Sequence, residues 1–79
     1  MITASTSKEE LLAMAVAVVK ELHSGEHYTV PDLFRKVEWR RINISMRKSL
    51  GRSFYDLRDT AEVNSTPIGD YSPQLYCKN

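Results

Sequence analysis

The sequence has few of the features that mark a secreted or membrane-bound protein. It contains one cysteine, Cys77, which excludes an internal disulfide and is typical of a reducing compartment. Its longest apolar run, residues 11–19, has nine residues, whereas a helix needs about 20 to cross a bilayer. Charged Lys8, Glu9 and Glu10 precede this run, so no secretory leader is expected. These absences predict a cytoplasmic protein without a membrane partner.

Motifs for catalysis and metal binding are missing as well. His23 and His27 are four residues apart, but Gly25 interrupts the chain between them, and Cys77 is far away in sequence. These residues therefore do not form a metal-ligand frame. We find no glycine-rich phosphate loop, nucleophile elbow or pair of carboxylates in a recognisable motif. We expect no enzymatic activity, no cofactor and no metal.

The 79 residues suffice for one small domain, and 42% hydrophobic with 27% charged residues is typical of a globular chain. We expect one domain over residues 1–79, with residues 1–6 as a flexible N-terminus. The net charge is only +1, but it is unevenly distributed. Residues 35–58 carry a local charge of +6 and the rest carries −5. This separation predicts one cationic surface on a nearly neutral molecule.

The first element is predicted to be a helix over residues 8–24. Ser7 and Glu10 have the spacing of a capping box, in which each side chain satisfies a free backbone donor. Apolar residues recur at helical spacing after them, and Gly25 is expected to end the helix in a left-handed conformation. This nearly all-round apolar helix is also a candidate surface for a homodimer.

A short strand over residues 26–29 and a second helix over residues 30–36 are expected next. Thr29, Pro31 and Asp32 are favourable residues for the start of that helix. Residues 37–44 fit either a continuation of the helix or, as we favour, a helix end and a turn. Trp39 is expected in the core, because a chain this small needs its largest apolar side chain there.

The third helix is predicted over residues 46–59, with Asn43 or Ser45 as its cap. One buried stripe is expected to comprise Met46, Leu50, Phe54 and Leu57. A hairpin with strands 61–65 and 74–78 should follow, with Val63, Leu75 and Cys77 facing inward. The element order predicts an α+β winged helix, in which a helix-turn-helix packs against a small antiparallel sheet.

Several residues in the middle of the chain resemble a small bacterial and phage family, family 1413 of the domains of unknown function. The similar residues are Asp32–Phe34, Glu38–Trp39, Arg47 and the segment Leu50–Phe54, with a weaker similarity at Tyr76. The resemblance covers about residues 25–60. It implies a compact domain in a bacterial or phage setting and no catalytic residues.

The third helix has basic residues where folding alone does not favour them. Arg47 and Lys48 lie in its first turn, where the helix dipole disfavours cations by about 0.3–1 kcal/mol each. With Arg52 and Tyr55 they are expected to contact the major groove of DNA, and Arg40 and Arg41 to contact flanking phosphates. The predicted function is a transcriptional or phage or plasmid regulator, acting as a homodimer on double-stranded DNA.

Other readings of the same residues stay open. The basic face can simply be solvated, or it can bind an acidic protein surface in an interaction module of the same fold. The hairpin loop favours the interaction module, because residues 64–74 carry Asp70 and no basic residue. Gly51 fits either a close approach of DNA or, as we favour, close packing between helices.

Overall fold

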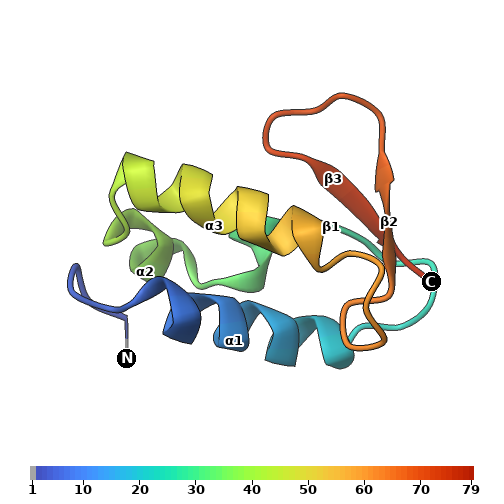
Figure 1. The fold of residues 1–79 in the computed structure, drawn as a ribbon, viewed down its shortest axis with the longest axis horizontal. Helices are drawn as coiled ribbons and strands as arrows, with labels where there is room; N and C mark the ends of the chain where they lie inside the picture. Colours follow the sequence, from blue (N-terminus) through green and yellow to red (C-terminus); the bar gives the residue numbers. More distant parts are fainter. Residues whose placement is uncertain (1) are drawn as a thin grey trace.

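The structure, a computed structural model, describes residues 2–79 as three α-helices, one 3₁₀ turn and a small sheet (Figure 1). In chain order the elements are α1 (Lys8–Lys20), β1 (His27–Thr29), η1 (Val30–Leu33), α2 (Lys36–Arg40), α3 (Ile44–Asp56), β2 (Ser65–Ile68) and β3 (Leu75–Lys78). The sheet is antiparallel with the order β1-β3-β2. The predicted α+β class is confirmed.

Helix α1 begins as predicted and ends four residues early. Ser7 is the N-cap, and its hydroxyl accepts a hydrogen bond from the backbone N–H of Glu10. The helix closes after Lys20, with Glu21 as the C-cap. Gly25 has the expected positive φ, at 90°, but it does not end the helix. Its N–H donates to the carbonyl of Lys78 in β3 at 2.7 Å.

The second predicted helix, residues 30–36, is wrong as a single element. The chain forms one 3₁₀ turn, in which the Asp32 carboxylate accepts a bond from the N–H of Thr29. Phe34 and Arg35 are then extended, and a separate helix begins at Lys36. The break places the Phe34 ring 5.4 Å from the ring of Trp39, a contact that a continuous helix would not give.

Helix α3 confirms the predicted stripe. Leu50 and Phe54 are fully buried, and Met46 and Leu57 pack against the same core. Of the two possible caps, the structure selects Asn43, whose side-chain oxygen accepts from the N–H of Met46 at 2.8 Å.

The hairpin is present, but its first strand and its inward face differ from the prediction. Strand β2 starts at Ser65, so residues 61–64 form a turn in which Val63 is buried. In β3 the buried residue is Tyr76, while Leu75 and Cys77 are half-buried. The aromatic core explains this choice: Tyr76 stacks on Tyr28 of β1 with ring centroids 5.5 Å apart.

Phe54 of α3 completes this aromatic centre by meeting both tyrosines edge-on. The Tyr28 hydroxyl donates to Ser65 Oγ at 2.6 Å, and the Ser65 hydroxyl in turn donates to the Val63 carbonyl. Burial raises the pKa of Tyr28, and burial raises that of Tyr76 to about 12. The sheet is thus attached to α3 through three aromatic rings.

Of residues 1–6, which were expected to form a flexible N-terminus, Met1 lies outside the described residues and Ile2 contacts α2 and Arg41 just after it. Ile2 is only 1% exposed and lies in the core cluster. Its N–H donates to the Glu38 carboxylate, and its carbonyl accepts from Arg41 at 2.9 Å. Among residues 2–79, no helix has the length and apolar character needed to cross a membrane.

Candidate nucleic-acid interface

A groove separates α3 from the C-terminal part of the hairpin loop. Its volume is about 380 Å³. One wall belongs to α3 and the other to the loop before β3, with Trp39 and the 3₁₀ turn completing the lining. The lining residues from α3 are Arg47, Lys48, Gly51 and Tyr55. The groove therefore brings together three of the six predicted contact residues.

Arg47 points toward the protein interior. Its guanidinium lies over the Trp39 ring, 5.3 Å from the centroid, and donates to the Trp39 carbonyl at 3.1 Å. Its Nε is buried and has no hydrogen-bond partner among the described residues. Arg47 thus contributes a positive charge to the floor of the groove, whereas the sequence had placed it with the outward-facing contacts.

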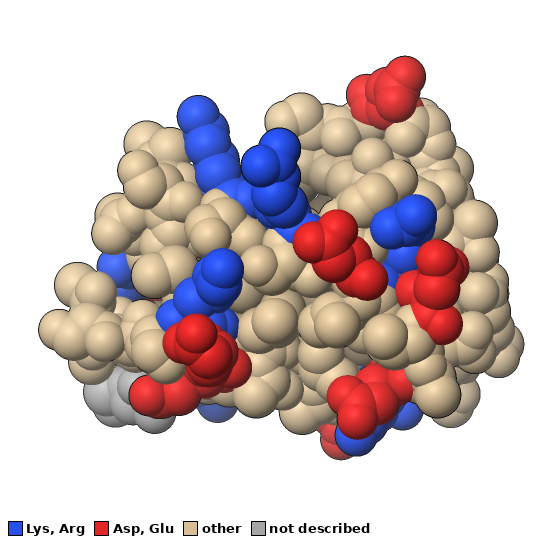
Figure 2. Space-filling model, viewed as in Figure 1, with Lys and Arg blue, Asp and Glu red and all other residues tan. Residues whose placement is uncertain are grey.

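Lys48 and Arg52 are exposed and lie one turn apart on α3. In the described part of the chain the ion pairs are Arg35–Glu38 and Arg58–Asp59, so neither side chain has a carboxylate within 4.0 Å. Figure 2 shows basic side chains rising from α3 beside the hairpin. Two unpaired cations therefore face solvent on this helix.

Tyr55 lies on the same helix and is already in contact with another residue. The Arg58 guanidinium stacks on its ring at 4.0 Å and donates to its carbonyl. The ring is still 40% exposed and lines the groove. Arg58, which also pairs with Asp59 at 4.0 Å, was not among the contact residues predicted from the sequence.

Arg40 and Arg41 are not part of the groove. Arg41 lies beside a separate shallow hollow on α2, and its guanidinium is engaged with the carbonyl of Ile2. Arg40 is exposed at the end of α2. Trp39 is the residue of α2 that lines the groove, whereas neither arginine does.

Gly51 also differs from expectation. A methyl group built at its Cα would have no atom within 4 Å outside its own local backbone. The favoured interpretation, close packing between helices, is therefore wrong. Gly51 instead widens the groove, in which it lies between Lys48 and Tyr55.

A basic residue of α1 lies close to the N-terminal half of α3, and nothing in the sequence indicated this proximity. Lys8 of α1 donates to Ser49 at 3.3 Å and borders a shallow hollow with Asn43 and Ser45. This contact depends on how α1 packs on α3, which no local pattern encodes. The first turn of α3 contains no acidic residue.

The hairpin supplies little charge to this region. Figure 2 shows an acidic group at the outer end of the molecule near the hairpin tip, where Asp70 follows Gly69. The side-chain amide of Gln74 is committed to carbonyls within the loop, at 2.9–3.0 Å. Within residues 2–79, no group of three His, Cys, Asp or Glu residues is arranged to hold a metal.

Most of the chain matches a known protein family. The family described as Domain of unknown function (DUF1413) matches residues 13–71, which confirms the resemblance seen in the sequence. The matched segment contains all six predicted contact residues and most of the groove. No curated protein and no solved structure matches the chain.

Proposed function

This chain belongs to the DUF1413 family, whose description names no activity, and we propose that it binds double-stranded DNA through the exposed face of α3 as a small winged-helix regulator. The observation that carries the proposal is the pair Lys48 and Arg52. Both cations are exposed and free of carboxylate partners among the described residues. Because α3 begins at Ile44, Lys48 is its fifth residue and lies beyond the first turn, so the helix dipole that was expected to disfavour this cation does not act on it.

The order of the elements supports the proposal. A helix, a strand, a 3₁₀ turn, two α-helices and a hairpin follow one another, and the third strand lies between the other two. A winged helix has this order, and its last helix enters the major groove with its N-terminal half toward the bases. By analogy, α3 would be the helix that enters the major groove.

The start of α3 offers a suitable phosphate site. The N–H groups of Met46 and Arg47 are bonded to Asn43, which leaves those of Ile44 and Ser45 for a ligand. A phosphate there would be attracted by these N–H groups and by the nearby ammonium group of Lys8. Lys48 and Arg52 would then lie along the groove of the duplex.

The test is fluorescence anisotropy with a labelled duplex of random sequence over a salt series. With about four to six phosphate contacts, the log–log slope should be about −4 to −5. The double variant Lys48→Ala/Arg52→Ala should weaken binding and reduce the slope by about 2. The matched control is Lys36→Ala, an exposed lysine at the start of α2 outside the groove. No binding at low salt, or equal effects of both changes, would refute the proposal.

A protein-interaction module is the second candidate. The groove favours it, because Trp39, Tyr55 and Pro73 give it an aromatic and apolar lining around the cation of Arg47. Such a site suits a peptide with one acidic side chain. A partner retained after nuclease treatment and lost on Tyr55→Ala would support this function, whereas loss of the partner with nucleic acid would support DNA binding.

A further inference from the structure

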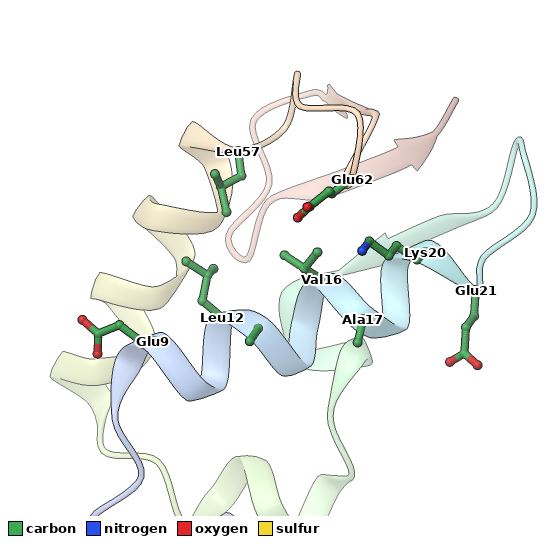
Figure 3. Close-up of a pocket in the computed structure, with 9 residues that line it drawn as sticks. Glu9, Leu12, Val16, Ala17, Lys20, Glu21, Leu57 and Glu62 are labelled. Atoms are coloured by element: carbon green, nitrogen blue, oxygen red, sulfur yellow. The ribbon is translucent and has the colours of Figure 1, made fainter.

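A second and larger hollow runs along the outer face of α1. Its volume is about 710 Å³, and the residues of α1 that line it are Glu9, Leu12, Ala13, Val16, Ala17 and Lys20. Leu57, just after α3, and Glu62, in the turn before β2, form the other side (Figure 3). The middle of this surface is apolar and its ends are charged.

Four of these residues lie along one line of the helix. Glu9, Ala13, Val16 and Lys20 are separated by four, three and four residues, the spacing of a seam along which two helices pack. The pattern along this seam is acidic, small, apolar and basic. The four positions are symmetric about a midpoint between residues 14 and 15, and the two end residues, Glu9 and Lys20, have opposite charges.

We propose that this seam binds the same seam of a second copy of the chain, with the two α1 helices antiparallel about a two-fold axis. Glu9 then meets the partner's Lys20 at both ends, each pair about 8 Å from the axis along the helix. Ala13 lies over the partner's Val16, which is only 8% exposed and forms the floor of the hollow. A parallel arrangement would place Glu9 against the partner's Glu9, which is unfavourable.

The charges of the seam have no partner within their own chain. Neither Glu9 nor Lys20 forms an ion pair with any residue in 2–79. Figure 3 shows Lys20 and Glu62 both directed over Val16, and Glu9 directed away from them along the helix. The small exposed side chains of Ala13 and Ala17 allow a second helix to approach closely.

The expected dimer is weak. One helix pair of this length covers less than the about 800 Å² per partner found in stable complexes. We therefore expect association between about 10 µM and 1 mM protein. Self-association is measured without nucleic acid, so the proposal stands or fails independently of DNA binding.

The experiment is sedimentation equilibrium of the full chain over this concentration range, combined with charge reversal. Glu9→Lys and Lys20→Glu should each weaken dimerisation at least about three-fold, because each opposes like charges at both ends. The double variant Glu9→Lys/Lys20→Glu should restore dimerisation. Asp70→Lys is the control for charge reversal, since Asp70 is exposed in the hairpin loop and does not line the hollow.

The melting temperature of each variant shows whether it is folded. Ala13→Arg is a second test, because it puts bulk and charge in the middle of the seam without changing the end charges. Restoration by the double variant together with loss on Ala13→Arg would establish the antiparallel seam. A monomer at all concentrations, additive losses in the double variant, or a dimer unaffected by Ala13→Arg would overturn it.

Discussion

Replacing Gly51 by alanine should stabilise the protein. Glycine in a helix interior costs about 1 kcal/mol relative to alanine, because its backbone loses more freedom on folding. Gly51 lies inside α3, and a Cβ at this position meets no atom within 4 Å. No steric term offsets the gain, so Gly51→Ala should raise the free energy of unfolding by about 0.5–1 kcal/mol.

The assay is thermal and urea unfolding followed by circular dichroism. For a domain of this size, 1 kcal/mol corresponds to about 4–8 °C in melting temperature. The matched control is Gly25→Ala, which also has open space around its Cβ but has a φ of 90°. That conformation disfavours a side chain by about 1–2 kcal/mol, so Gly25→Ala should destabilise the protein. A lower melting temperature for Gly51→Ala would refute the argument that a Cβ at this position meets no steric obstacle.

The same substitution also tests the groove. A methyl group at position 51 narrows the space between α3 and the hairpin loop. If a ligand approaches the backbone there, Gly51→Ala should bind it more weakly although the fold is more stable. Weaker binding with a higher melting temperature cannot come from unfolding. A substitution with this combination of effects would mark Gly51 as a residue retained for function.

Three further changes have defined outcomes. The pKa of Tyr76 is about 12 in the folded state, whereas a tyrosine in the unfolded chain ionises near pH 10, so the protein should lose about 2–3 kcal/mol of stability between about pH 10 and 12. Tyr76→Phe should not show this loss. Unfolding at pH 9.5 and 11.5 measures the difference, and an equal pH dependence in the variant would contradict it. Ile2→Ala should lower the free energy of unfolding by about 2–4 kcal/mol. Val37→Ala, at a residue that is 59% exposed, should lower it by less than about 0.5 kcal/mol. Asn43→Ala should cost about 1 kcal/mol through loss of the α3 cap, and urea unfolding should show no comparable loss for Ser45→Ala.

The parts of the fold that follow from neighbouring residues could be predicted. The Ser7 cap, the β1 strand and the Leu50 and Phe54 stripe each depend on spacing within a few residues, and the structure has all of them. Propensity and capping act locally, so they can be read from a short segment.

The errors arise where distant residues decide between local alternatives. Strand β3 turns Tyr76 inward because the rings of Tyr28 and Phe54, which come from distant segments, contact it in the core. The contacts of Ile2 likewise come from Glu38 and Arg41, which are more than 30 residues away. No local pattern carries the position of these partners.

The position of Arg47 follows partly from local spacing and partly from a contact outside its helix, and its substitution tests whether it stabilises the fold. Arg47, Leu50 and Phe54 are spaced i, i+3 and i+7, so helical periodicity alone puts Arg47 at the edge of the buried stripe; its Trp39 acceptor, however, lies outside α3. Arg47→Ala should therefore cost about 1–3 kcal/mol of stability, through loss of the stacked and hydrogen-bonded guanidinium. Lys48→Ala, one residue away and exposed, should change stability by less than about 0.5 kcal/mol. Equal melting temperatures for the two variants would show that the interior position of Arg47 does not stabilise the fold.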